Sequence, residues 1–595
     1  MIHKSSDMKR IILFTLIFIF NYACVQAQEE ITIPYSGYAV PKERPAGYEN
    51  LSAPGSSGVD RVKMPIPGKS GIKLVYPVLM MHGVNGRADQ WNTFTDSLDA
   101  VYGLTFGGRF DFCLNYDGNN STANLSFWPT ANADMALFTG TWVAGDYYYM
   151  NYDVGDDGSY PVSFGHSVIS GMSAAYKQGR AIREAVYRIM QLTGRDKVIL
   201  VGHSMGGLAV RQYLQNPANW QSDGEHHIAK LLTGGSPHAG SDASLSQFGD
   251  WVIGLDDRSE GIRDLQATYE YSGDPCVFLF GGLESYAVMD GMMFSEYYNV
   301  DVNCNSIEGN NILGLNERSM PTDLDHACIV AECDGCPAAT PGDGLVLSTS
   351  ANINCIYPKL TKNVFWYHKF NLIQIHGDLL EVTHLLMEGL DEPNDYALSY
   401  DIGFDITYTA FTSRQPVDGY LNDYDDFKFS IPVKSNVKVS ISNIALSDLK
   451  VRFVDMANNT IGTIGSSNGA GSLIYSQVLD PGSYYLEIYG LPTNTSYLHP
   501  YNFKMTKTTV GTGIESSDAP AGISIFPNPA VDRINIEGLN GNTGIKIYDM
   551  IGNLVMQTTA EDNIELDISR LSQGVYTIIA EQNGEKIINR VVVNR

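Results

Sequence analysis

The run Gly202-His203-Ser204-Met205-Gly206 holds the residues whose types and spacing most clearly favour chemistry. It directly follows the apolar segment Val198-Ile199-Leu200-Val201, which is typical of a buried strand, and helix-period segments lie on both sides. A tight turn from a buried strand into a helix requires small residues two positions before and two after its central serine, and it exposes the serine hydroxyl above the sheet edge. The sequence therefore predicts that Ser204 is a nucleophile rather than part of a structural glycine turn.

A serine nucleophile needs a base, and a carboxylate that orients that base. The candidate carboxylate is Asp343, in the run Gly342-Asp343-Gly344-Leu345-Val346, although an Asp-Gly pair is also common in simple turns. The base should lie on a loop that reaches both Ser204 and Asp343.

Three histidines follow Asp343 in the chain: His368, His376 and His384. His376 comes after the apolar segment 370–375 and before Gly377-Asp378-Leu379-Leu380, which is typical of a helix start. His384 lies beside Leu385-Leu386-Met387 and is expected in the middle of a helix, whereas His368 lies in a strand-like aromatic run. We therefore predict that His376 is the base, with His384 as the alternative.

These motifs resemble the lipase branch of the α/β-hydrolases, including the GPI inositol-deacylase type, over about residues 70–395. The form G-H-S-M-G-G is familiar there, and D-G-L-V at Asp343 is similar to the segment that carries the acid of the triad in the order Ser, Asp, His. His82-Gly83-Val84, after the strand-like segment 76–81, resembles the family's oxyanion loop. The resemblance implies that the backbone N–H groups of Val84 and Met205 face the oxyanion. His238, in a Ser-Pro-His turn that relatives share, is expected to be structural.

The resemblance implies an α/β-hydrolase fold, with a mostly parallel sheet, helices on both faces and cap insertions at about 104–168 and 242–339. It favours a secreted serine hydrolase that cleaves carboxylic esters, a lipase or esterase acting on an ester or lipid substrate, with no metal or organic cofactor. A peptidase, polyester depolymerase or acyltransferase could use the same triad, and a non-catalytic surface binding protein is a further alternative.

The N-terminal segment is predicted to be a secretory signal peptide, residues 1–27, with basic residues, a short apolar core and the cleavage site Val25-Gln26-Ala27. A lipid-attached Cys24 is the alternative. The apolar core is too short to span a bilayer, and no transmembrane segment is expected. The net charge of −27 opposes binding to nucleic acid.

All cysteines of the exported chain lie in its first two thirds, and an exported protein favours disulfides. We expect disulfides that clamp the loop before Asp343, with a four-thiolate zinc site at Cys328, Cys333, Cys336 and Cys355 as the alternative. The exported chain has an odd number of cysteines, so at least one of them is expected to be unpaired. They are Cys113, Cys276, Cys304, Cys328, Cys333, Cys336 and Cys355.

After Asp391-Glu392-Pro393 the hydrophobic pattern changes to alternation, which predicts small antiparallel β-sandwich domains. The segment 423–429 and the later Pro481-Gly482-Ser483 resemble the pre-peptidase C-terminal domain. There the acidic cluster Asp423, Asp425 and Asp426 is expected to be a solvated turn, with calcium binding as the alternative.

The last segment resembles the C-terminal sorting domain of type IX secretion, on the runs 525–530, 547–552 and 571–576. This resemblance implies handling by the type IX machinery and a secreted or outer-surface location reached through the periplasm. The expected organisation is thus a signal peptide, a hydrolase domain over 28–395, a β-sandwich over 396–508, a linker over 509–521 and the sorting domain over 522–595.

Overall fold

The computed structural model describes residues 71–84, 86–116, 134–138, 140–154, 169–241, 260–265, 277–283, 288–290, 295–297, 302–303, 311–337, 339, 341–412, 423–445, 448–490, 500–510, 523–539, 541–582 and 585–594. The predicted signal peptide and most of the predicted linker lie outside these residues. The chain divides into two compact units, Met1–Lys507 and Thr508–Arg595.

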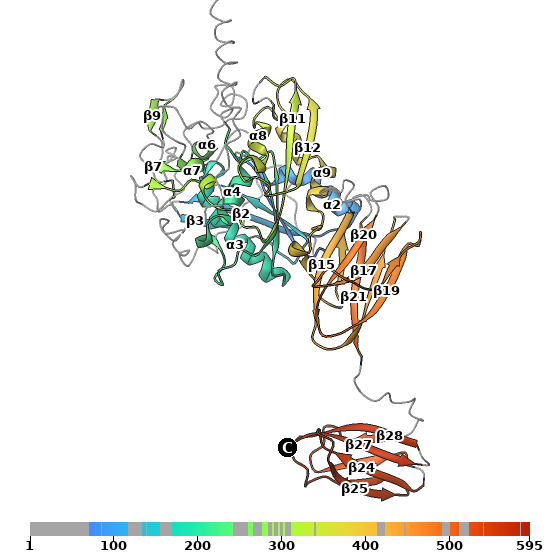
Figure 1. Cartoon of the computed structure of the whole chain (residues 1–595). Coiled ribbons are helices and arrows are strands. Elements are labelled where there is room, and N and C mark those ends of the chain that lie inside the picture. The colour runs from blue at the N-terminus through green and yellow to red at the C-terminus, as the bar shows by residue number, and fades with distance from the viewer. Residues whose placement is uncertain are drawn as a thin grey trace, which may run out of the picture. The chain divides into compact units, whose positions relative to one another are not determined.

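The first unit is built on an eight-stranded sheet in the order β12-β11-β6-β5-β1-β4-β2-β3 (Figure 1). All neighbouring strands are parallel except the pair β2 and β3 at one edge. The strands are β1 Val78–Met81, β2 Phe106–Tyr116, β3 Asp134–Leu137, β4 Tyr147–Asn151, β5 Val198–His203, β6 Ile228–Gly234, β11 Asp325–Asp334 and β12 Asn363–Phe370. The predicted mostly parallel sheet is therefore confirmed.

Alternate residues of the central strands pack on opposite faces, which explains the continuous apolar runs of these strands. Val78 and Met80 belong to one hydrophobic core with helices α2 and α9, whereas Leu79 and Met81 belong to another with α3, α4 and α8. Helices thus cover both faces of the sheet. They are α2 Asn92–Tyr102, α3 Ala175–Thr193, α4 Met205–Leu214, α8 Ser348–Ala351 and α9 Thr383–Leu390.

Shorter elements connect these strands and helices. They are η2 Ala88–Trp91, η3 Ile169–Met172, η4 Pro217–Asn219, α6 Glu260–Leu265, α7 Val277–Phe280, β7 Gly282–Leu283, β8 Val288–Asp290, β9 Ser295–Tyr297, β10 Asn311–Ile312, η7 Leu315–Glu317, η8 Ile353–Cys355, η9 His376–Leu380 and η10 Tyr396–Leu398. Within the first insertion the sequence predicts one strand, residues 147–152, and the structure adds β2 and β3. The glycines of β2 interrupt its apolar pattern, so the sequence does not reveal its burial.

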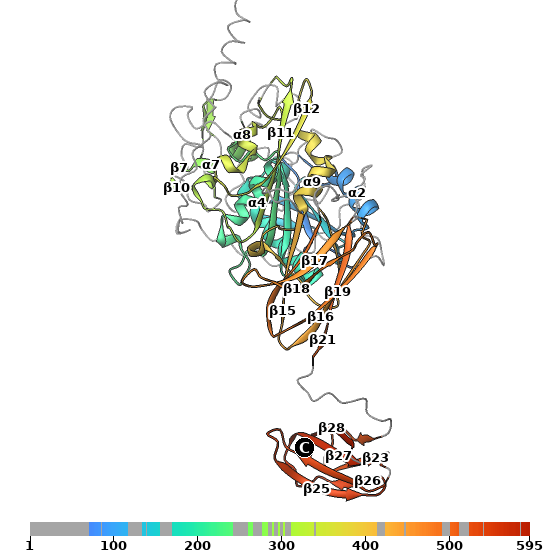
Figure 2. The ribbon, with the colours of Figure 1, turned by 45° about the vertical axis from the view of Figure 1, so that its right-hand side comes forward.

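The first β-sandwich belongs to the same compact unit and consists of a five-stranded and a four-stranded sheet (Figure 2). Its apolar residues share one hydrophobic core with α2 and α9 of the hydrolase part. Its strands are β13 Tyr400–Asp401, β14 Thr407–Ala410, β15 Asp423–Ile431, β16 Ser435–Ser442, β17 Leu449–Asp455, β18 Thr460–Ser466, β19 Ser472–Leu479, β20 Gly482–Gly490 and β21 Tyr501–Thr509.

The second unit is a separate sandwich of a three-stranded and a four-stranded sheet around its own core. Its strands are β22 Ser524–Phe526, β23 Arg533–Glu537, β24 Thr543–Tyr548, β25 Leu554–Ala560, β26 Ile564–Asp567, β27 Gly574–Gln582 and β28 Glu585–Val593. Two antiparallel sandwiches therefore follow the parallel sheet, as predicted.

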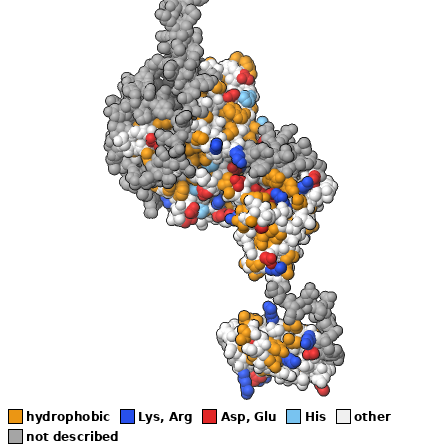
Figure 3. Space-filling model, in the orientation of Figure 1, with side chains coloured by type: hydrophobic (Ala, Val, Ile, Leu, Met, Phe, Trp, Pro, Cys, Tyr) orange, Lys and Arg blue, Asp and Glu red, His pale blue; other side chains and the backbone are white. Residues whose placement is uncertain are grey.

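On the face shown in Figure 3, acidic, basic and hydrophobic side chains are interspersed over the described part of each unit. Among the described residues, no helix is both long enough and apolar enough to cross a bilayer.

Candidate active site

Ser204 lies in a strained turn between β5, which ends at His203, and α4, which begins at Met205. Its φ of 56° and ψ of −131° are rarely adopted by residues other than glycine. A Cβ atom at position 202 would lie 2.6 Å from the Gly207 nitrogen, and one at position 206 would lie 2.7 Å from the His82 oxygen. The turn therefore needs glycine at both positions, as the sequence predicts.

The loop after β1 lies directly against this serine, because a Cβ atom at position 83 would come within 2.6 Å of the Ser204 Cβ. His82 holds the loop in place. Its Nε2 accepts a hydrogen bond of 3.0 Å from the Tyr152 N–H, so its Nδ1 donates to the Gly83 oxygen at 2.8 Å. Val84 packs on the hydrophobic cluster that contains Met205. Met205 is thus the neighbour of Ser204 in the chain, and Val84 directly follows the glycine that lies against it.

Asp343 and His376 form a buried pair. The His376 Nδ1 lies 2.6 Å from the Asp343 Oδ2, and the two residues are 1% and 7% exposed. The other carboxylate oxygen accepts the N–H groups of Leu345 at 2.8 Å and Val346 at 2.7 Å. An ionised carboxylate can only accept hydrogen bonds, so the proton of this contact lies on Nδ1, and in the neutral ring Nε2 is then an acceptor.

Neighbours of Ser204 bring this pair to the strained turn. The ring of His203 lies 4.7 Å from that of His376, and its Nε2 is 3.0 Å from the His376 carbonyl oxygen. The Ser204 N–H donates to the Gly234 oxygen at 2.9 Å, and the next residue, Gly235, borders both Asp343 and His376. Within the described part of the chain, no hydrogen bond joins Ser204 to His376.

The other histidines lie elsewhere. His384 is exposed and is the second residue of α9, so the prediction that it lies in mid-helix was wrong. His368 lies on β12 with its side chain 55% exposed, 3.7 Å from Glu332. His238 is buried, with its Nε2 3.1 Å from the Thr233 hydroxyl.

The sequence analysis did not identify His203 as a residue that positions His376. The two residues come into contact only in the folded chain.

Buried histidines are expected to make a destabilising contribution to the first unit at acidic pH. Burial lowers the pKa of His82 from 6.5 to about 4 and, together with the charge of His376, that of His203 to about 3. At each of these histidines the unfolded chain therefore binds more protons below pH 6.5, and the contribution of that histidine to the free energy of unfolding falls as the pH decreases, by up to about 2 kcal/mol at pH 5. Urea unfolding at pH 7 and pH 5 measures this loss.

Two substitutions test whether buried histidines cause this loss of stability. Burial also lowers the pKa of His238, so His238→Gln should reduce the loss between the two pH values, whereas His368→Gln, at an exposed position, should not. An equal difference between the two pH values in His238→Gln and in the unaltered protein would contradict the prediction.

A disulfide between Cys333 and Cys336 closes the end of β11 just before the Asp343 loop. The Cys333 N–H donates to the Gly342 oxygen at 2.7 Å, which ties this closed turn to the residue before the acid. Two of the four thiols of the alternative zinc site are thus consumed, and that alternative was wrong. Cys328 is not in a disulfide, and Cys276 and Cys304 lie outside the described residues.

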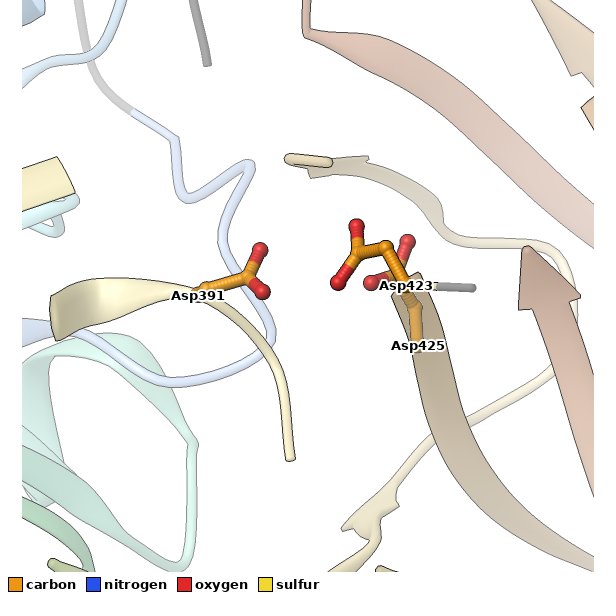
Figure 4. Close-up of side chains that lie close together, drawn as sticks. All are labelled: Asp391, Asp423 and Asp425. Carbon is orange, nitrogen blue, oxygen red and sulfur yellow. The ribbon is translucent and has the colours of Figure 1, made fainter. Parts of the chain in front are cut away.

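The acidic cluster of the first sandwich is not a solvated turn, so that prediction was wrong. Asp423, Asp425 and Asp426 are at most 2% exposed, and Asp391 joins the first two (Figure 4). Burial, with the neighbouring carboxylates as the second cause, raises the pKa of Asp391 and of Asp425 well above the usual range. Among the described residues, only this group places three side chains of metal-binding type within 4.8 Å of one another.

Two segments of the chain match known protein families. Residues 76–252 match the alpha/beta hydrolase fold, and residues 524–594 match the secretion system C-terminal sorting domain. These matches confirm the hydrolase fold and the sorting domain that the sequence predicts. No curated protein matches the chain.

Several solved structures are similar to parts of the chain. The lin2722 gene product of Listeria innocua is 14% identical, with 52% of this chain and 89% of that chain covered and a TM-score of 0.27. The Bacillus licheniformis lipase BlEst2 in mature form is 16% identical, with 56% and 95% covered and a TM-score of 0.28. The pre-peptidase C-terminal domain of a Bacillus anthracis collagenase is 17% identical, with 20% and 99% covered and a TM-score of 0.15.

Proposed function

We propose that this chain, which joins an alpha/beta hydrolase fold to a secretion sorting domain, is a secreted serine hydrolase. It cleaves carboxylic esters, as a lipase or esterase. The observation that carries the proposal is the buried His376–Asp343 pair beside a serine held at φ 56°. A strained serine, a histidine with an acceptor nitrogen and a carboxylate behind it are the parts that acyl transfer requires.

In the proposed mechanism the Ser204 Oγ attacks the acyl carbon while the His376 Nε2 takes its proton. Asp343 holds the imidazole in the tautomer with a proton on Nδ1 and stabilises the imidazolium that forms. The same proton then passes to the leaving alcohol. Water activated by His376 releases the acid from the acyl-enzyme.

The N–H groups of Val84 and Met205 stabilise the tetrahedral oxyanion in this mechanism. Met205 is the first residue of α4, and the N-terminus of a helix carries partial positive charge and unpaired N–H groups. The loop at Gly83, in contact with Ser204, brings Val84 to the same place. Both donors are backbone groups, so they need no rearrangement when the charge develops.

Hydrolysis of p-nitrophenyl esters of graded chain length, measured beside a panel of peptide amides, tests the proposed reaction. The proposal expects ester turnover that depends on Ser204 and little amide turnover. Preferred cleavage of peptides would favour the peptidase alternative, and no turnover of either class would favour the binding protein.

The sorting domain is expected to contribute nothing to catalysis. The second unit has its own hydrophobic core, and residues 508–595 contain neither histidine nor cysteine. A chain that ends near Gly511 should therefore keep the full kcat/KM of the ester reaction when it is made in a foreign host, and initial-rate assays check this.

In the native bacterium the same shortened chain should accumulate in the periplasm, because it lacks the segment that matches the sorting domain. Fractionation and immunoblotting follow its location. Normal export of the shortened chain, or a large loss of its specific activity, would count against the assignment of this unit as an address.

A further inference from the structure

Exposed apolar side chains gather at the end of β12, which is an edge strand of the eight-stranded sheet. Trp366, Phe370, Leu372 and Ile373 are between 45% and 69% exposed, and they are most of the large exposed hydrophobic residues described in the hydrolase part. Single exposed apolar residues are ordinary in soluble proteins, whereas a contiguous group of them commonly marks a contact surface. We call these four residues the apolar tip.

The apolar tip projects from the sheet because β11 and β12 continue past their neighbour β6. β6 pairs with β11 only as far as Ile329, whereas β11 and β12 stay paired up to Asp334 and Phe370. The last part of these two strands is therefore a two-stranded ribbon that extends beyond β6 (Figure 1 and Figure 2). This end of the parallel strands is also the end at which Ser204 follows β5.

Contacts within the ribbon hold the aromatic part of the apolar tip in place. On one face of β12, Val364 packs against the hydrophobic core at α8. Trp366, His368 and Phe370 follow it on the same face, and the rings of Trp366 and His368 stack at 6.1 Å. A Cβ atom at Gly335 would lie 2.8 Å from the Phe370 ring, so Phe370 lies over the turn that the disulfide closes. The tip is thus formed before a partner binds.

The charges beside the apolar tip favour a partner without net negative charge. Lys369 donates a hydrogen bond of 2.6 Å to the carboxylate of Asp378, and the His368 Nδ1 lies 3.7 Å from the Glu332 carboxylate. Asp334, at the end of β11, adds an exposed acid. The chain as a whole has a net charge of −27, which repels anionic surfaces.

We propose that the apolar tip docks this chain on a lipid surface of neutral or zwitterionic headgroups, an inference that rests on the proposed cleavage of lipid esters. The segment 371–375 runs from the tip directly to His376, and the Ile375 N–H donates to the Asp343 backbone oxygen at 2.8 Å. Lipid bound at the tip is therefore next to the segment that carries the base. Trp366 suits such a surface, because a tryptophan ring combines an apolar body with a polar N–H group.

A second copy of the chain fits the apolar tip less well than lipid does. Four side chains of this kind contribute on the order of 400 Å² of apolar surface, whereas each partner of a stable protein dimer buries about 800 Å². A lipid surface requires no complementary shape. Large apolar side chains enter it at the level of the headgroups, and each one that leaves water adds to the affinity.

Flotation of the full chain with vesicles of ether-linked phosphatidylcholine tests the surface, because these lipids contain no ester to cleave. Binding is expected to change little with salt and to weaken when phosphatidylglycerol is added. Ile373→Ser should lower the partition coefficient onto the vesicles at least about tenfold, since one large apolar side chain is then lost. Ile474→Ser, the same change at a 66% exposed isoleucine of β19, should leave it unchanged.

Tryptophan fluorescence gives a second measurement. Phosphatidylcholine brominated on its acyl chains should quench the emission of the unaltered chain, and Trp366→Phe should remove most of this quenching. Quenching that persists in Trp366→Phe would overturn the proposal, because a different part of the chain would then enter the lipid.

Absence of flotation by the unaltered chain, or equal flotation by Ile373→Ser, would overturn the proposal. Tighter binding to phosphatidylglycerol vesicles would overturn it as well, since the contact would then be electrostatic. A dimer in sedimentation velocity that Ile373→Ser dissociates would assign the apolar tip to a second copy instead.

Turnover of a soluble p-nitrophenyl ester separates the failure of this proposal from that of the proposed function. Ester turnover without vesicle binding would overturn the docking surface alone. Vesicle binding without ester turnover would support the docking surface and overturn the proposed reaction.

Discussion

Ser204→Ala is expected to abolish ester hydrolysis, with a fall in kcat on the order of 10⁶, the loss seen when a triad nucleophile is removed from a serine hydrolase. The physical reason is that the remaining groups can polarise an ester carbonyl but can form no acyl-enzyme. Steady-state rates on a soluble p-nitrophenyl ester measure the effect, and circular dichroism establishes that the variant is folded.

The matched control is Ser442→Ala, the same deletion at an exposed serine of β16. It should retain the kcat and KM of the unaltered chain. Ester turnover by Ser204→Ala at a rate close to that of this control would remove Ser204 from the mechanism.

His376→Ala should reduce kcat nearly as far as Ser204→Ala, because nucleophile and base act as a unit and their losses are not additive. His384→Ala should keep kcat close to that of the unaltered chain, since His384 is exposed near the start of α9 and His376 is the histidine bonded to Asp343. Rates for the two single variants, and for the double variant with Ser204→Ala, test this.

The double variant separates a catalytic loss from a structural one. If His376 is the base, adding His376→Ala to Ser204→Ala causes little further loss. A large loss in His384→Ala beside a mild one in His376→Ala would show that the two assignments must be exchanged.

The nucleophile turn was predictable because all the residues that shape it are neighbours in the chain. Gly202 and Gly206 avoid clashes within that turn and with the loop at His82. The requirement for glycine at both positions can therefore be recognised in one short segment of the sequence. The pair of Asp343 and His376 is different, because its members are separated by 33 positions and meet only when the ends of β11 and β12 come together. Local context could therefore favour His376 over His384 without excluding the latter.

The acidic cluster shows why the rest could not be predicted. The composition of segment 423–426 predicts a polar turn. The sequence does not indicate that the surface around this segment is covered in the folded protein. In the structure Asp423 and Asp425 are buried on β15, and their partner Asp391 comes from the hydrolase part. The sequence predicted disulfides near the Asp343 loop but not the pairing of Cys333 with Cys336, because the spacing of cysteines does not determine which of them pair.

Mapping the adduct of a fluorophosphonate probe on the unaltered chain tests the central claim most directly. Such a probe reacts with an activated serine and stays bound in place of the acyl group. Tandem mass spectrometry of the digested protein should find one adduct, on Ser204, and its formation should stop in His376→Ala. No adduct, or an adduct on a different residue, would contradict the assignment of this chain as a serine hydrolase that acts through Ser204.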